Sequence, residues 1–473
     1  MALAIFSEAR RKWWTLAAVS FGLFMIMLDN TVVNVALPSI QRDLGAGLSQ
    51  LQWIVTGYAL SFAALMLIGG KLADAYGRRR IFVLGIVVFT LASLWCGLAD
   101  SGEMLIAARI VQGVGAALMN PATLSIIAAT FPPKERGMAI GIWAGVSALA
   151  LAIGPLVGGL LTEQLSWHWI FFVNVPVGVL GIAASYLLIR ESKDETHVSL
   201  DLPGLATSAL GLFALTYGLI EANAYGWGSP RILGSFSLAV VALASFVVIE
   251  RRRRSPMLDL TLFRSGTYTG ANVAMLLVAL AMFGVFFFVS LYMQNVLGYS
   301  AVEAGAAFLP MTLVIILVAP IAGKLSDVYG SRWLMSGGMV LLGLQLLYLS
   351  QLGTDAGFWN LLPAFLVGGF GMSLTMTPTA AAATRAVPVH KSGVGAAVLN
   401  AMRQVGGSLG IALMGAIVAH EASGRQGVEG FMAGFERALL AAAAFAFVGA
   451  VVAYALVRQE AEHEEAAPAE VPA

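Results

Sequence analysis

The sequence reads G-K-L-A-D-A-Y-G-R-R at residues 70–79 and G-K-L-S-D-V-Y-G-S-R at residues 323–332. Seven of the ten positions are identical, and the two copies lie 253 positions apart (323 − 70). Long apolar runs that begin near residues 14 and 267 are separated by the same distance (267 − 14). Because the motif and the apolar pattern repeat at one offset, the sequence predicts two related halves.

Apolar runs surround both copies of the motif. Of the 473 residues, 59% are hydrophobic and 11% are charged, whereas soluble domains carry roughly 25% charged residues. Runs of about 20 apolar residues are long enough to cross a bilayer, and they must be helical because lipid offers the backbone no hydrogen-bond partner. The predicted spans are 14–37, 51–73, 81–99, 104–127, 137–161, 168–189, 204–222, 231–249, 267–294, 302–323, 333–352, 358–380, 391–419 and 432–457.

These fourteen spans define an all-α polytopic membrane protein with five segments. We expect a six-helix bundle at 14–190, two inserted transmembrane helices with their linkers at 191–266, and a second six-helix bundle at 267–457. Residues 1–13 precede the first span, and the acidic, Ala- and Pro-rich residues 458–473 predict a disordered tail. Parallel six-helix halves are typical of transporters, with the substrate site between the halves.

The basic residues predict the orientation. If both termini share one side, 21 of the 27 Lys and Arg residues fall on that side and four on the other. Cytoplasmic loops carry such an excess of Lys and Arg. We therefore expect a multi-pass protein of the bacterial inner (plasma) membrane with both termini in the cytoplasm.

Composition excludes several other classes of protein. The formal net charge of +1 gives no attraction to nucleic acid, and Cys96 is the single cysteine, so no disulfide framework exists. The histidines have no ligand spacing, and we expect no metal and no cofactor. A membrane enzyme would need catalytic groups gathered at one membrane face or a sizeable extramembrane domain, and neither is present. We expect a monomer that contacts lipid, protons and a small-molecule substrate.

The first copy of the repeated motif carries an acid in an unfavourable place. Gly70 and Gly77 allow a tight turn between two helices, and Asp74 lies near the end of the second span, where the helix dipole disfavours an acid. Arg78, four residues on, is a candidate partner. The alternative is an ordinary basic loop, which explains the arginines but neither the acid nor the second copy.

The motif resembles the signature of the loop between the second and third spans in the major facilitator superfamily. In that family the Asp–Arg pair latches the two halves in the outward-facing state, so the resemblance implies a latch here. Its second copy contributes Asp327 and Arg332. Ala75 and Val328 stand where a basic residue is common in the family, which implies a weaker latch.

A carboxylate interrupts the first span, which reads L-D-N-T-V-V-N-V-A-L-P at 28–38. Ionisable residues inside membranes are costly and mark functional sites by default, and Asp29 could load and release protons. A structural ion pair is the alternative. The stretch resembles the first-span motif of the drug:proton antiporters, in which the Asp takes part in proton coupling.

Arg109 in the fourth span is the expected partner of Asp29. Counting from the ends of their spans at 1.5 Å per residue, the two depths differ by about 5 Å. Arg109, Gln112, Ala116 and Asn120 recur at spacings of three and four, so they share one helix face. The run R-I-V-Q-G-V-G-A-A at 109–117 resembles the family's fourth-span motif, whose Arg serves proton coupling. Helix packing is the alternative.

The fifth span contains a glycine-rich stretch, A-G-V-S-A-L-A-L-A-I-G-P-L-V-G-G-L-L at 144–161. Its small residues and proline predict close helix packing and bending. The positions Gly154, Pro155, Gly158 and Gly159 resemble the antiporter motif of the superfamily's exporters, which implies export.

Two further stretches, W-H-W-I-F-F-V-N-V-P at 167–176 and D-L-P-G at 201–204, resemble the fourteen-span drug:proton antiporter family. His168 stands where that family usually has Arg. Glu221, at the end of the seventh span, is either a second proton-coupling group or an exposed edge residue.

The resemblance thus implies a proton-coupled antiporter that exports drugs or toxic small molecules by alternating access. The alternative is a major-facilitator importer or symporter of a defined metabolite, which would have a poor fifth-span motif and usually twelve spans. A polar and aromatic cavity would suit a lipophilic substrate, although membrane aromatics are also common packing and interface anchors. The cavity candidates are Asn34, Trp53, Tyr58, Gln112, Asn120, Trp143 and Tyr292.

Overall fold

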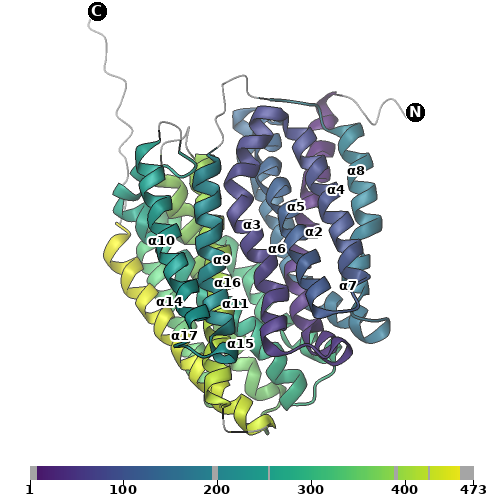
Figure 1. Ribbon diagram of the computed structural model, residues 1–473. Helices are drawn as coiled ribbons and strands as arrows, with labels where there is room; N and C mark the ends of the chain where they lie inside the picture. Colours follow the sequence, from purple (N-terminus) through teal and green to yellow (C-terminus); the bar gives the residue numbers. More distant parts are fainter. Residues whose placement is uncertain are drawn as a thin grey trace, which may run out of the picture.

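The computed structural model describes residues 8–193, 201–253, 256–387, 392–423, 425 and 427–458. The predicted tail beyond residue 458 and the first seven residues lie outside these ranges. The described chain is helical throughout its membrane region (Figure 1), which confirms the predicted fold class.

Each predicted span coincides with a helix or a pair of short helices. The first half contains α2 (Glu8–Leu44), α3 (Leu48–Tyr76), α4 (Arg78–Gly97), α5 (Gly102–Thr130), α6 (Pro133–Gln164), α7 (Trp169–Phe172) and α8 (Asn174–Leu188). The inserted helices are α9 (Leu202–Tyr225) and α10 (Pro230–Arg252). The second half contains η1 (Leu260–Arg264), α11 (Gly266–Leu291), η2 (Tyr292–Val296), α12 (Ala301–Ala307), α13 (Leu309–Tyr329), α14 (Ser331–Leu349), α15 (Phe358–Arg385), α16 (Ser392–Glu421) and α17 (Gly427–Leu456).

Thirteen of these spans are long and apolar enough to cross a membrane within the described residues. The remaining predicted span, 137–161, coincides with α6, a helix of 32 residues. The tenth predicted span is divided into α12 and α13 next to Pro310. Proline lacks the amide hydrogen that would continue the ladder of helical hydrogen bonds, which accounts for the break.

Helix packing repeats between the halves as the motif does. In the first half α2 packs on α6, α3 and α4 pack on α5, and α4 packs on α8. In the second half α11 packs on α16, α13 and α14 pack on α15, and α14 packs on α17. The two bundles stand side by side in Figure 1, with the first half on the right and the second on the left.

The inserted helices bridge the two bundles. Helix α9 contacts α3 of the first half and α16 of the second, and α10 packs on α9 (Figure 1). Only 17% of the most apolar window of α10 is buried inside the protein. Helix α10 therefore presents most of its apolar surface outwards, as a lipid-facing helix does.

The two bundles contact one another at the face opposite the one where α2 begins and α17 ends, here called the far face. Gln52 Nε2 at the start of α3 donates to the Ile411 carbonyl at 2.7 Å, and Gln294 Nε2 donates to the Val35 carbonyl at 2.8 Å. The amide of Val302 donates to Glu163 Oε2 at 3.0 Å. All three contacts lie in the halves of their helices that are nearer the far face, and this arrangement is here called the state closed at that face.

Glycines allow the helices to approach closely at this contact. A Cβ atom at Gly159 of α6 would collide with the Ala301 backbone of α12, and a Cβ at Gly305 of α12 would collide with the Pro155 backbone. Because the clashing atoms are backbone atoms, a side chain at either glycine could be accommodated only by separating the helices.

We expect Gly159→Val to disfavour the state closed at the far face. A cysteine at Val35, which is 1% exposed in this state, should then react faster with a membrane-impermeant maleimide in a background without Cys96. Gly145→Val, on the same helix, is the matched control, because a Cβ added at Gly145 would have no atom within 4 Å. Equal labelling rates in the two variants would contradict the prediction.

Candidate functional site

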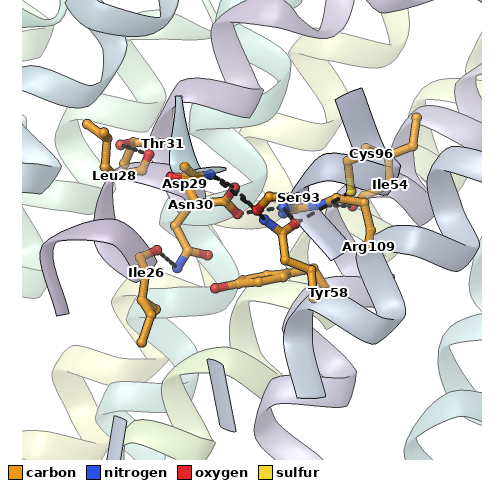
Figure 2. Close-up of polar contacts among 12 residues, drawn as sticks. Ile26, Leu28, Asp29, Asn30, Thr31, Ile54, Tyr58, Ser93, Cys96 and Arg109 are labelled. Carbon is orange, nitrogen blue, oxygen red and sulfur yellow. Dashed lines mark hydrogen bonds and ion pairs between the residues drawn. The ribbon is translucent and has the colours of Figure 1, made fainter. Parts of the chain in front are cut away.

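A buried ion pair lies in the middle of the first bundle. Asp29, halfway along α2, is 0% exposed, and Arg109 of α5 is 1% exposed. Arg109 Nη1 donates to Asp29 Oδ2 at 2.5 Å (Figure 2). The structure therefore brings together the two charged residues that the sequence predicted as partners.

Two side-chain amides complete the environment of the carboxylate. Gln112 Nε2 donates to Asp29 Oδ1 at 2.9 Å and to Ser93 Oγ at 2.7 Å. Asn174 Nδ2 donates to the same Asp29 oxygen at 3.3 Å. Asp29 thus accepts hydrogen bonds from one cation and two amides, an arrangement that suits its ionised form.

Arg109 is held on its other side by the backbone and by aromatic rings. Its Nε donates to the Ile54 carbonyl at 3.1 Å, and its guanidinium lies 4.2 Å from the ring centre of Tyr58 and 5.7 Å from that of Phe171. Cation–π contacts of this kind stabilise a desolvated arginine. Figure 2 shows Tyr58 beneath the polar network, between Arg109 and the Asn30 side chain.

Sequence reasoning missed part of this network. Asn174 stands within the quoted stretch W-H-W-I-F-F-V-N-V-P, but its amide was not assigned a contact, and Ser93 and Cys96 lie in an apolar run. The Cys96 thiol lies 3.7 Å from Gln112 Oε1. Asn174 on α8 and Ser93 and Cys96 on α4 are uncharged, so the sequence does not mark them as parts of a polar network. Only the packing of these helices shows their contacts.

The glycine-rich motif of α6 is a packing surface. A Cβ at Gly154 would collide with Thr31, and a Cβ at Gly158 would lie 2.8 Å from the Val32 backbone, both on α2. Gly159 faces Ala301 across the far-face contact, as described above. The motif thus joins the helix that carries Asp29 to the contact between the two bundles.

The first copy of the repeated motif forms the expected local pair. Arg78 Nε donates to Asp74 Oδ1 at 3.0 Å, and Gly77 has a φ of +112°, which favours glycine. The backbone amides of Arg79 and Arg80 donate to Glu191, which follows α8. These contacts involve only the first half and Glu191, the first residue of the segment that follows it.

The second copy makes different contacts. Asp327 forms an ion pair with Arg385 at the end of α15. The Arg332 guanidinium lies 4.0 Å from the ring centre of Tyr454. Arg385 was not identified from sequence, because it lies outside the repeated ten residues.

Glu221 is not among the hydrogen-bond partners of Asp29 and lies at the contact between α9 and α3. It accepts hydrogen bonds from Ser49 Oγ at 2.7 Å and Trp53 Nε1 at 3.1 Å. Glu221 is therefore a partly buried, hydrogen-bonded residue at the join between an inserted helix and the first half.

The predicted cavity residues fall into two sets. Trp53 is engaged with Glu221, and the Tyr292 hydroxyl donates to the Gly353 carbonyl at 2.5 Å while its ring stacks on Phe435. Both rings are thus held in packing contacts. Gln112 belongs to the Asp29 network.

The other predicted cavity residues retain unused polar atoms or contact the helix that carries Arg109. Asn34 Oδ1, Tyr58 Oη and Asn120 Oδ1 are buried and have no hydrogen-bond partner within the described part of the chain. Trp143 Nε1 donates to Thr123 Oγ1 on α5 at 2.9 Å. Buried polar atoms without partners require water or a ligand, so these three remain candidates for contacts with a substrate.

Comparisons with known proteins identify the class. The chain matches the Major Facilitator Superfamily over residues 19–411 and 271–472, and it belongs to this family of transporters. This membership confirms the prediction of a transporter and not an enzyme. The chain also resembles a solved bacterial homologue of the human lysosomal transporter Spinster, in an inward-facing and unoccupied conformation, with a TM-score of 0.67. That likeness covers 94% of this chain and 96% of the other at 18% identity, so it shows the fold alone.

Two curated relatives are more similar in sequence. The chain is 39% identical to the puromycin resistance protein of Streptomyces alboniger, over 98% of this chain and 95% of that protein. It is 38% identical to the tetracenomycin C resistance and export protein of Streptomyces glaucescens, over 86% of this chain and 76% of that protein.

We expect Arg109→Met to destabilise the protein by about 3–5 kcal/mol, because it leaves the Asp29 charge buried without its cation. The double variant Asp29→Asn/Arg109→Met should recover most of this loss, since the introduced asparagine is neutral and still accepts from Gln112 and Asn174. Denaturant unfolding of the purified protein in detergent would measure both. A double variant as unstable as Arg109→Met would show that the charge pair is not what Arg109 stabilises.

Proposed function

We propose that the chain is a fourteen-span, proton-coupled antiporter that exports drugs or toxic small molecules across the bacterial inner membrane. The observation that carries the proposal is the fully buried Asp29–Arg109 pair, in which the carboxylate is the only acid of the network among the described residues. Relatives that share more than a third of its residues are named for resistance to or export of antibiotics. Both termini would lie in the cytoplasm, so the far face would be the outer face.

In the coupling step, a proton would replace the Arg109 guanidinium as the partner of the Asp29 carboxylate. In the state described here the carboxylate accepts from Arg109, Gln112 and Asn174. A proton on Asp29 would remove the charge that holds Arg109, and the released guanidinium would remain beside Tyr58, with which it is already in contact. A ligand or ion can shift a conformational equilibrium only through different affinities for the two states, and this exchange supplies such a difference.

The glycine motif supplies a mechanical connection from this pair to the far face. Helix α2 carries Asp29 and packs against Gly154 and Gly158 of α6, and the same helix meets α12 at Gly159. A change in the position of α2 would thus be transmitted by α6 to the contact between the two bundles. We propose that protonation of Asp29 and opening of the far face are linked in this way.

The remaining site assignments follow as parts of this proposal. The substrate path would use the buried polar atoms of Asn34, Tyr58 and Asn120 together with Trp143, whereas Trp53 and Tyr292 would serve packing. Asp74 and Arg78 would act as a conformational latch with their second-half counterparts Asp327 and Arg332. The Asp74–Arg78 pair is already formed in the state closed at the far face. A latch would therefore require this pair to be stronger or weaker in the state open at that face. Glu221 is a second candidate for proton coupling.

The segment boundaries proposed from sequence, 14–190, 191–266 and 267–457, suit this mechanism. Helix α9, in the segment 191–266, contacts both bundles. An importer or symporter of a defined metabolite remains the alternative function, and the direction of transport separates the two.

We expect the folded Asp29→Asn variant to lose transport driven by a proton gradient, because Asn cannot release a proton, and the unfolding transition of the purified variant checks that it folds. The measurement is efflux of puromycin from cells and uptake into inverted vesicles, each with and without a protonophore. Asp100→Asn is a matched control, because Asp100 is exposed in the loop between α4 and α5. Proton-driven efflux by Asp29→Asn at the wild-type rate would exclude Asp29 as the coupling residue, and uptake into cells in place of efflux would favour the importer.

A further inference from the structure

Two buried carboxyl groups meet at the base of the inserted helices. Asp201 precedes α9 and is 0% exposed, and Glu250 lies in the last turn of α10 and is 3% exposed. Acids are almost never buried to this extent unless a partner compensates the charge. Neither residue belongs to the Asp29 network, which lies on α2, α3, α4, α5 and α8.

One oxygen of each carboxyl group has conventional partners. Asp201 Oδ1 accepts from the Gly204 amide at 2.9 Å, which caps α9, and it lies 3.3 Å from Arg253 Nε. Glu250 Oε2 accepts from the Leu258 amide at 2.7 Å. These contacts fix the orientation of both side chains.

The other two oxygens face one another without a donor. Asp201 Oδ2 and Glu250 Oε1 are buried and have no hydrogen-bond partner among the described residues. Both lie next to the Gly204 Cα, where an added Cβ would collide with each of them. Two carboxylates that share such a site cannot both be ionised without a large penalty, and one retains a proton.

The nearby cations do not fill this gap. Arg253, whose side chain is 38% exposed, lies against the opposite oxygen of Asp201. Lys71, from α3, donates its ammonium to the Pro256 carbonyl at 2.9 Å. Among the described residues, Lys71 and Arg253 are the cations that interact electrostatically with Asp201 and Glu250 here.

We propose that Asp201 and Glu250 form a second proton-binding site, in which a single shared proton joins Asp201 Oδ2 to Glu250 Oε1. The proton closes the contact between the first turn of α9 and the last turn of α10. It also preserves the position of Lys71, because a neutral acid beside a carboxylate attracts the ammonium less than two carboxylates would.

Loss of this proton has a structural consequence. The second negative charge would draw Lys71 away from the Pro256 carbonyl, which would release the segment before Leu258 from α3. Lys71 belongs to the repeated motif at 70–79, so the site would connect the inserted helices to the end of α3 in a pH-dependent manner. The site does not depend on which substrate is transported or in which direction.

The experiment measures the thermal unfolding midpoint of the full-length protein in detergent from about pH 6 to about pH 9. Between the ordinary carboxyl pKa of about 4 and the pH at which the folded pair loses its shared proton, only the folded state holds this proton. Stability therefore falls as the pH rises through this window and levels off above it. Glu250→Gln replaces the shared proton with an amide donor to Asp201 Oδ2, and we expect it to reduce the fall in midpoint by about half or more. Asp201→Asn, which still caps α9, should act in the same way.

Infrared spectroscopy gives a direct second measurement. Wild-type protein should show a protonated carboxyl band near neutral pH that is lost in both Glu250→Gln and Asp201→Asn. Glu103→Gln is the matched control, because Glu103 at the start of α5 is exposed and bonded to the Gln50 amide. An unchanged band and an unchanged pH dependence in both variants would overturn the proposal. So would a stability that depends on sodium or potassium concentration in place of pH, since the pair would then bind a metal cation.

Discussion

The hydrocarbon core of a membrane offers no hydrogen-bond partner, and the rest of this structure depends on that constraint. Backbone groups must be satisfied within each span, which makes every span a helix. Charged side chains must likewise find partners inside the protein, and Asp29 therefore lies against Arg109, Gln112 and Asn174. A charge pair that is fully desolvated is sensitive to the loss of either partner. The same physics that makes the pair costly also makes its protonation a large local change.

The constraint explains which parts of the molecule were predictable. Helix positions follow from apolar runs, and the pairing of Asp29 with Arg109 follows from two opposite charges at similar depth. Asn174 and Ser93 were missed because they are neutral, and neutral polar residues are common in membrane helices for packing alone. The break between α12 and α13 next to Pro310 was not predicted, and it is recognised only from the helix ends in the structure. Arg385 as partner of Asp327 required the packing of α15 against α13, which no local pattern encodes.

The two halves repeat the same helix packing but not the same ionisable residues. The offset of 253 that relates the motifs places Met282 opposite Asp29 (29 + 253), and Met282 is buried within the apolar core of the second half. The two motifs also differ in their ion pairs. Asp74 of the first motif pairs with Arg78 within the motif, whereas Asp327 of the second pairs with Arg385 outside it. The two halves therefore keep equivalent helix contacts while ionisable groups concentrate in the first. In the proposed mechanism, this asymmetry would place the coupling carboxylate in the first half, and the second half would be the surface against which the first half moves.

The contact at the far face has the properties that a reversible closure needs. Its hydrogen bonds come mainly from neutral amides, as in Gln52 to Ile411 and Gln294 to Val35. Water can replace such bonds at little net cost, because a typical hydrogen bond contributes only about 0.5–1.5 kcal/mol beyond its exchange with water. The glycine contacts between α6 and α12 add close packing against backbone atoms. A closure built from these elements can be opened by a modest energy difference, and in the proposed mechanism protonation of Asp29 would supply that difference.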